Sequence, residues 1–273
     1  MALGFGQGFG ITARRAGGGA APTLTDDLAA IFAATSAKGY MLRLDSAATL
    51  FQNSGGTGAV TTVADPVGYA TDLSGNGNHF TQATAKNRPT WNGTGCDFDG
   101  GGDGLTRAAL DLAGRSYVYL AFAGQKNTGT LNGPIMYHGN PIASTDGAVG
   151  IAANGSGIIA YQYQARGVTS QTQSRISASD DVMGSHVAYF NLTVGTSADT
   201  QLDVWQDGVA QTVPVGSSTG IGPLTTQTHY IGSNAATQHL SGKIRRASLL
   251  AVNTPLTTDQ VNTLIAWAEE GRT

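Results

Sequence analysis

The near absence of glutamate and lysine is the feature that most constrains how this chain can fold. Its two glutamates, Glu269 and Glu270, are adjacent near the C-terminus, and it has four lysines among 273 residues. Solvent-exposed helices are built mainly from Glu, Lys and Leu, so a long helical bundle is nearly ruled out. Glycine instead supplies 39 residues, roughly twice its usual share of about 7%. This composition, with many Thr, Ser, Asn and Val residues, favours short strands joined by tight turns.

The charge and the hydropathy pattern exclude several classes of partner. A net charge of −3 and a pI near 5.9 give no basic stripe for nucleic acid and no polybasic patch for a membrane. No stretch approaches the roughly 18 apolar residues of a membrane span. The N-terminus lacks a signal-peptide pattern, because Arg14 and Arg15 follow its weakly apolar part. Cys96 is the single cysteine and cannot form an internal disulfide. We therefore expect no nucleic acid partner, no membrane insertion and no signal peptide.

Four segments have the pattern of strands. They are Ser116–Ala123, His186–Val194, Gln201–Gln206 and Ile244–Val252. The dipeptide Asp207-Gly208, directly after the third segment, predicts a hairpin turn. Several short strands separated by Gly, Asn, Asp and Ser turns indicate an all-β sandwich or jelly roll.

Two helices are expected, one at each end of this β region. Residues 24–36 have an apolar stripe, with Thr25 as the predicted N-cap and Gly39 as the predicted end. A capping-box spacing begins a second helix at Thr257, and Gly271 ends it. We expect this second helix to pack against one edge of the sandwich.

The first 23 residues form a separate glycine-rich block. Glycine at this density costs too much backbone entropy for the block to fold alone. Leu3, Phe5, Phe9 and Ile11 are apolar side chains suited to docking on a partner chain; the alternative is a free tail. We predict an extended docking segment over residues 1–23, a short helix and linker over 24–39, and the sandwich over 40–273.

Four segments, taken in order, resemble the laminin-G-like, concanavalin A-like jelly roll. The resemblance covers roughly residues 65–270 and implies an all-β, two-sheet antiparallel jelly-roll sandwich with a short N-terminal helix and a C-terminal helix. The matching segments are Asp72–His79 with Arg88-Pro89, Phe98–Leu105, His186–Ala188 with Leu202–Gly208, and Tyr230–Ser233 with Leu240–Ile244 and Leu256–Gln260.

A preceding stretch resembles a leader found in structural proteins of tailed bacteriophages and related particles. It comprises residues 46–52 and residues 65–68, followed by the Asp72 segment. The resemblance implies a protein of the virion surface, on head or tail, that contacts other virion proteins through residues 1–23. By the same analogy it implies a homo-oligomer, with a trimer the common form of such projections.

Aspartates are the acidic residues available for catalysis in the β region. Glycosidases with the jelly-roll fold that this sequence resembles use two nearby glutamates on one strand. Here no glutamate precedes Glu269. Strand alternation would allow Asp97 with Asp99, or Asp203 with Asp207, to share a face. We favour polar turn residues over a catalytic pair at these positions, and we predict that the protein is not an enzyme.

Two oxygen-rich segments are candidates for one weak calcium site, and otherwise no cofactor is predicted. The alternative is that these side chains form Asx-turns with their own backbone. The first segment has the opening spacing of a calcium loop but lacks its closing glutamate. The candidate residues are Asp72, Ser74 and Asn76 in the first segment, and Asp97, Asp99 and Asp103 in the second.

A group of aromatic residues is the most informative candidate binding site. Val118, Leu120 and Phe122 are predicted to face the core between the sheets, so the alternate residues of the same and neighbouring strands would face outward. Outward aromatic rings beside amides suit stacking on sugars or contact with another subunit; the alternative is that a loop or the terminal helix covers them. The predicted outward residues are Tyr117, Tyr119, Tyr161, Tyr163, Tyr189 and Trp205.

These observations together predict a virion surface protein that docks through its N-terminus and displays a jelly roll, binding host cell-surface glycan during adsorption. Two alternatives stay open. One is a virion-associated polysaccharide depolymerase that uses aspartates. The other is a secreted bacterial lectin or adhesin, against which the missing export signal counts.

Overall fold

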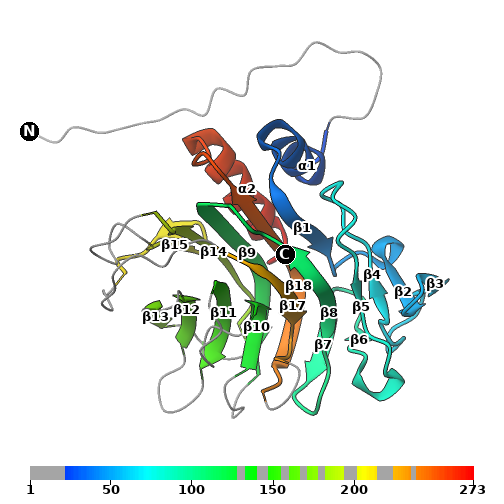
Figure 1. The fold of residues 1–273 in the computed structure, drawn as a ribbon. Coiled ribbons are helices and arrows are strands. Elements are labelled where there is room, and N and C mark those ends of the chain that lie inside the picture. Colours follow the sequence, from blue (N-terminus) through cyan, green and yellow to red (C-terminus); the bar gives the residue numbers. More distant parts are fainter. Residues whose placement is uncertain are drawn as a thin grey trace, which may run out of the picture.

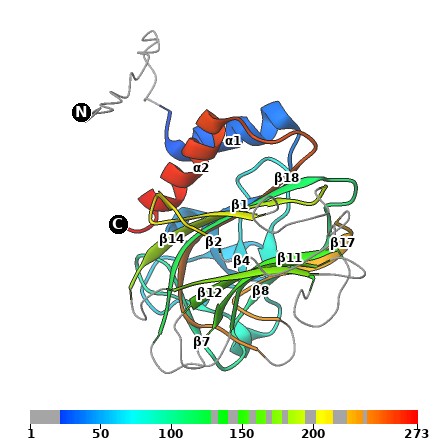
Figure 2. The same ribbon diagram turned by 90° about the vertical axis from the view of Figure 1, so that its left-hand side faces the viewer.

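Two antiparallel sheets packed face to face make up most of the described part of the molecule, with two helices side by side on the outer face of one sheet (Figures 1 and 2). The structure is a computed structural model. The predicted two-sheet sandwich with an N-terminal and a C-terminal helix is confirmed. The structure describes residues 22–127, 133–139, 147–154, 160–166, 171–177, 182–193, 202–213, 224–234 and 238–273.

The sheet that the helices cover, called sheet 1, has its strands in the order β16-β15-β14-β9-β18-β7-β6. β1 pairs with the C-terminal half of β18, on the edge away from β9. Its longest strands, β9 and β18, pair along most of their length. The bounds are β1 Lys38–Arg43, β6 Thr90–Trp91, β7 Cys96–Asp99, β9 Tyr117–Lys126, β14 Gly184–Asn191, β15 Leu202–Gln206, β16 Val209–Ala210 and β18 Ser241–Val252.

The opposite sheet, called sheet 2, has the order β13-β12-β11-β10-β17-β8-β5-β4-β2-β3. Two short 3-10 helices, Ala47–Thr49 and Ala85–Asn87, lie between its N-terminal strands or beside them. The bounds are β2 Leu50–Asn53, β3 Thr57–Ala59, β4 Tyr69–Ala70, β5 Phe80–Thr81, β8 Leu105–Asp111, β10 Gly133–His138, β11 Ala148–Asn154, β12 Ala160–Arg166, β13 Gln171–Ser177 and β17 Thr226–Ile231.

The alternating residues of sheet 1 divide between two apolar clusters. Val118, Leu120 and Phe122 of β9 pack between the sheets, as their alternation predicts. The intervening residues, including Tyr119 and Ala121, pack beneath the helices. Sheet 1 is therefore apolar on both faces. The predicted hairpin turn after β15 is confirmed, because Asp207 and Gly208 have φ values of 51° and 74°, as a type I′ turn requires.

The first helix, α1 Leu24–Thr35, differs at both ends from the prediction. Its N-cap is Thr23 rather than Thr25, because Asp26 completes a capping box with Thr23. It ends at Ser36, whose φ of 48° is left-handed, rather than at Gly39. Gly39 lies in β1, where its φ of 128° and close approach to the Leu249 backbone exclude a side chain.

The second helix, α2 Thr258–Glu270, starts and ends as predicted, with Thr257 and Gln260 forming the capping box and Gly271 as the C-cap. It does not pack against an edge of the sandwich. It crosses the outer face of sheet 1 beside α1 (Figure 2). Leu264, Trp267 and Ala268 are buried there, because the second apolar face of sheet 1 must be covered.

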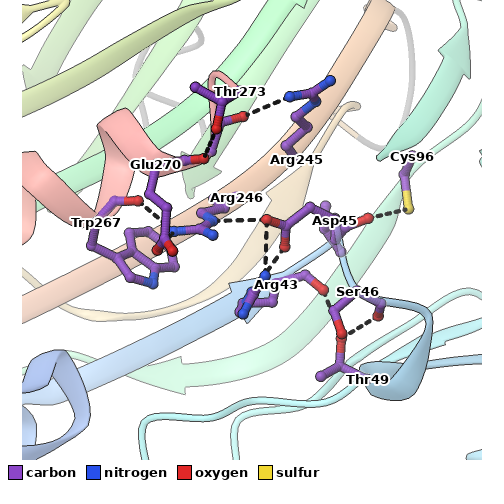
Figure 3. A network of polar contacts seen from close by, with 12 residues as sticks. Arg43, Asp45, Ser46, Thr49, Cys96, Arg245, Arg246, Trp267, Glu270 and Thr273 are labelled. Atoms are coloured by element: carbon purple, nitrogen blue, oxygen red, sulfur yellow. Dashed lines mark hydrogen bonds and ion pairs between the residues drawn. The ribbon is translucent and has the colours of Figure 1, made fainter. Parts of the chain in front are cut away.

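A buried arginine fixes the C-terminal end of α2 to sheet 1 (Figure 3). Arg246 of β18 is 2% exposed, and it pairs with Asp45 at 2.9 Å and with Glu270 of α2 at 2.8 Å. It also donates to the Trp267 carbonyl at 2.7 Å, and its guanidinium lies 5.4 Å from the Trp267 ring centre. Asp45 also pairs with Arg43 at 3.0 Å. Because Arg246 connects Asp45 to two residues of α2, we infer that it sets the position of α2.

Candidate functional site

A groove of about 300 Å³ opens on the outer face of sheet 1 where β9, β14 and β15 meet the beginning of α2. We call it the aromatic groove. Its volume is near the lower end of the range of roughly 300–1,000 Å³ that is usual for ligand pockets. It is lined by Tyr119, Tyr189, Asp203, Trp205, Pro255, Leu256, Thr258, Val261 and Asn262.

The floor of the groove follows from the register of three neighbouring strands. Asp203 of β15 is directly opposite Tyr189 of β14, which is directly opposite Tyr119 of β9. Directly opposed residues have their side chains on the same face of a sheet. Trp205, two residues after Asp203, projects from that face as well. The groove is therefore built on rigid strands.

The tyrosine rings on this face contact one another. The rings of Tyr119 and Tyr189 have centres 4.8 Å apart and an interplanar angle of 30°. Tyr117 is nearly parallel to Tyr189, at 6.4 Å and 11°. Such contacts hold aromatic rings in fixed orientations. The structure thus brings together four of the six predicted outward residues, Tyr117, Tyr119, Tyr189 and Trp205.

The segment before α2 is fixed to this floor by a hydrogen bond. The Leu256 backbone N–H donates to the Tyr119 hydroxyl over 3.0 Å. Tyr119 is 2% exposed, and burial, with a contribution from the Asp203 charge, raises its pKa to about 12. Tyr119 therefore remains a neutral hydroxyl at neutral pH, and it is mainly a support for the groove wall.

Asp203 is the charged residue of the groove lining. Its side chain is exposed at the mouth, yet partial loss of surrounding water raises its pKa above the ordinary value. Thr258 and Asn262, one turn apart on α2, add hydroxyl and amide groups opposite the sheet. The groove thus combines apolar ring faces with a few polar groups, as ligand sites commonly do.

The prediction that Tyr161 and Tyr163 share this outward surface is wrong. Both residues of β12 are buried in the core between the sheets. The Tyr163 hydroxyl lies 2.7 Å from Nδ1 of His186, whose ring stacks on Phe122 at 4.6 Å. Burial lowers the pKa of His186 to about 3, so this histidine is a neutral hydrogen-bonding partner inside the core.

The first predicted calcium segment is a network of hydrogen bonds that ties a loop to β1. The two carboxylate oxygens of Asp72 accept from the backbone N–H groups of Met41, Ser74 and Asn78 and from the Ser74 hydroxyl. The Asn76 side chain donates to carbonyls at the start of β1. These acceptors are occupied by donors, so the Asx-turn alternative describes Asp72, Ser74 and Asn76.

The second predicted calcium segment also forms local turns. Asp97 accepts from the Asn92 side chain at 2.7 Å, and Asp99 accepts from the Gly101 N–H at 2.6 Å. Asp103 accepts from the Asp99 N–H, and burial beside Asp99 raises its pKa to about 6. Over the described ranges, no three acidic, histidine or cysteine side chains lie close enough to hold a metal ion.

The remaining candidates fall outside the groove. Asp207 does not join Asp203 as a pair, since it accepts from the Ser185 N–H in its turn and faces Arg272 at 3.4 Å. Leu3, Phe5, Phe9 and Ile11 of the predicted docking segment lie outside the described residues. Neither described helix has the length and apolar character that crossing a membrane requires.

The alternative that the terminal helix covers part of the aromatic face is confirmed, because α2 packs on Tyr119, Tyr189 and Trp205. The sequence did not identify the residues at the start of α2 that line the groove. The residues concerned are Pro255, Leu256, Thr258, Val261 and Asn262. The sequence of β9 does indicate that its outer face is covered. Its alternating positions are apolar or aromatic on both faces, and such a strand must be covered on both sides. An amphipathic helix at the chain end was the available cover.

Comparisons with known proteins bear on the fold. No protein-family model and no curated protein matches the sequence. The chain is similar to a GH54 α-L-arabinofuranosidase soaked with a cyclic sulfate inhibitor, with a TM-score of 0.52 and 13% identity over 90% of this chain and 65% of that one. The botulinum neurotoxin serotype D binding domain gives 0.53 and 9%, over 84% and 50% of the two chains. A Trypanosoma rangeli sialidase in complex with the inhibitor DANA gives 0.50 and 15%, over 89% and 38%.

These likenesses show a shared sandwich fold, and this chain spans about two thirds or less of each of those proteins. They also correct one prediction. The expectation that the protein is not an enzyme is contradicted, because the solved structures that share its fold include glycoside hydrolases. The chain therefore has the two-sheet sandwich architecture found in an arabinofuranosidase, a sialidase and a toxin binding domain.

Proposed function

We propose that the protein binds carbohydrate in the aromatic groove. The observation on which this depends is the placement of Tyr189 and Trp205 on one rigid sheet face, opposite Thr258 and Asn262 of α2. The C–H face of a sugar ring packs on aromatic rings while its hydroxyls need hydrogen-bonding groups around the edge. The groove offers both kinds of surface within about 300 Å³.

The fold neighbours support this proposal in general terms. One is an arabinofuranosidase complexed with arabinofuranosyl-alpha-1,2-xylobiose, and another is a sialidase in complex with an inhibitor. A sandwich of this kind is thus compatible with recognition of sugars. Function depends on the site rather than on the fold, so the groove residues supply the specific argument.

A binding assay with two matched variants tests the proposal. A glycan array identifies a ligand, and calorimetry then measures its affinity for the wild type, Trp205→Ala and Tyr230→Ala. Tyr230 is a partly buried aromatic residue of β17 in sheet 2, away from the groove. We expect affinity to fall in Trp205→Ala and to remain in Tyr230→Ala. An array without hits, or equal affinities for the two variants, would overturn the proposal.

Glycan cleavage is a second candidate, favoured by Asp203. A carboxyl group whose pKa is raised keeps its proton longer, as a general acid must. The common two-carboxylate mechanism requires a second acidic group, and Asp203 is the single carboxylate among the described lining residues. Release of reducing ends from the bound glycan, abolished in Asp203→Asn while binding persists, would support cleavage.

Display on a phage or phage-like particle is a separate proposal about where the groove acts. It depends on the resemblance of residues 46–52 and 65–68 to a virion leader and on the apolar residues of segment 1–23. We propose that this segment contacts other virion proteins, in a homo-oligomer that presents the groove to host glycan. Particles assembled with a chain lacking residues 1–23 should omit the protein; normal incorporation would contradict this placement.

A further inference from the structure

The charge of the residues that line the aromatic groove indicates which class of sugar it binds best. Its lining contains one acidic residue, Asp203, and no cationic one among the described residues. Asp203 has no ion pair or hydrogen bond to another described residue through its side chain. A carboxylate beside apolar rings, with no cation next to it among the described residues, attracts a cationic ligand.

Aromatic residues are the neighbours of Asp203 on this face of the sheet. Tyr189 is directly opposite Asp203 on the neighbouring strand, and Trp205 projects from the same face two residues along. Tyr119 follows Tyr189 in the same cross-strand row. A cation over the face of Trp or Tyr is attracted by the ring quadrupole, and the attraction increases where water is excluded.

We infer that the aromatic groove prefers a sugar with a free ammonium group, held between Asp203 and the rings of Tyr189 and Trp205. This inference rests on the proposed carbohydrate function and names its ligand class, an amino sugar that is not acetylated. The ammonium completes the ion pair of Asp203, and the rest of the sugar ring packs on the aromatic floor.

The N-terminus of α2 is the main opposing charge. A helix N-terminus is equivalent to roughly half a positive charge, and its effect falls off within the first turn. The capping box of Thr257 and Gln260 satisfies part of that turn, and Asp259 adds a negative charge to it. The full charge of Asp203 is therefore larger than the residual helix charge, and the groove favours cations.

The same charge balance predicts which sugars the groove disfavours. A uronic or sialic acid would place its carboxylate near Asp203, and like charges at short distance repel. Neutral hexoses and N-acetylated sugars keep the ring packing but lose the ion pair. We therefore expect amino sugars to bind best, neutral sugars next and acidic sugars least.

Three hexasaccharides of the same linkage test the preference for amino sugars over neutral and N-acetylated ones, by calorimetry with the full chain. They are β-1,4-linked hexamers of glucosamine, N-acetylglucosamine and glucose, compared at about pH 5.5 in low salt so that the sugar amines are largely protonated. The glucosamine hexamer should bind roughly tenfold more tightly than the other two. In Asp203→Asn the glucosamine and glucose hexamers should bind with equal affinity, because the ion pair is lost.

A matched charge control separates the groove from the net charge of the protein. Asp27 is exposed in the first turn of α1, so Asp27→Asn removes the same charge elsewhere and should keep the preference. Equal affinities of the wild type for the three hexamers would overturn the inference and leave carbohydrate binding intact. An equal loss of preference in Asp27→Asn would overturn it too. No binding of any glycan would overturn the proposed function itself.

Discussion

Tyr163 of β12 faces the core from sheet 2, whereas Tyr189 of β14 lies on the face of sheet 1 that points away from this core. Tyr163 is fully buried between the sheets, with its hydroxyl on His186. Tyr189 is partly exposed on the outer face of sheet 1, in the groove beside α2. Strand alternation tells which residues share a face but not whether that face is inside.

The neighbours of each tyrosine distinguish the two cases. In β12 the residues that alternate with Tyr161 and Tyr163 are Gln162 and Gln164, so the tyrosines are the more apolar face and belong in the core. In β14 the residues that alternate with Tyr189 are Ala188 and Phe190, so the opposite face supplies the core. A tyrosine is therefore placed by the polarity of its alternate neighbours.

The largest expected effect is on the inner tyrosine. Tyr163→Ala should lower the free energy of unfolding by about 3–5 kcal/mol, because it leaves a cavity and an unpaired His186 nitrogen. Tyr189→Ala should cost about 1 kcal/mol, since part of its ring already contacts water. Denaturant unfolding of both variants measures the difference. Equal losses would contradict the assignment of the two faces.

The second-largest effect should come from low pH, which should lower the free energy of unfolding through the buried histidines. Burial lowers the pKa of His138 to about 4, of His186 to about 3, and of His229 well below its ordinary value. The unfolded chain binds these protons near pH 6.5 and the folded chain does not, so stability falls as pH falls through that value. Asp103, with its pKa raised to about 6, works in the opposite direction.

From about pH 7 to about pH 5.5 we expect a net loss of roughly 3 kcal/mol. Unfolding curves at several pH values measure the slope. In His138→Gln the slope should decrease by the contribution of one histidine, whatever the absolute stability of that variant. A stability that is constant over this interval would show that these histidines are not buried in their neutral form.

The attachment of α2 should have a smaller effect on stability and a clear effect on the groove. Arg246→Ala should cost about 2–3 kcal/mol, less than for a wholly buried pair, because Glu270 is half exposed. It should also weaken glycan binding, since α2 supplies one wall. Glu270→Gln is the control and should cost less than about 1 kcal/mol. Unchanged binding in a folded Arg246→Ala protein would contradict the role of this contact.

At the groove itself the main effect should be on binding. Trp205→Ala should weaken glycan binding by about 1–2 kcal/mol, or roughly tenfold. It should lower the free energy of unfolding by about 1 kcal/mol, as for Tyr189→Ala, because both rings are half-buried on the same face. Titration calorimetry and denaturant unfolding of the same preparation separate the two effects. A loss of binding that parallels a loss of stability would mean that Trp205 is a structural residue.

The sandwich and one side of the groove could be predicted from the sequence. Alternation in β9, β14 and β15 predicts that Tyr117, Tyr119, Tyr189 and Trp205 share a face, and the capping box predicts α2. The sequence left two positions open for α2, at an edge of the sandwich or over the aromatic residues, because an apolar stripe on a helix does not specify which apolar surface it covers. Asp203 likewise becomes a groove residue only through its register with Tyr189.

The central claim is that carbohydrate binds on the outer aromatic face of sheet 1, and tryptophan fluorescence tests it most directly. Of the three tryptophans, Trp205 lines the groove, Trp91 lies at the opposite end of sheet 1, and Trp267 is a buried residue of α2. Titration with the array-selected glycan should change the emission of the wild type and of Trp91→Phe, and the change should be lost in Trp205→Phe. A change of equal size in Trp205→Phe would contradict the account.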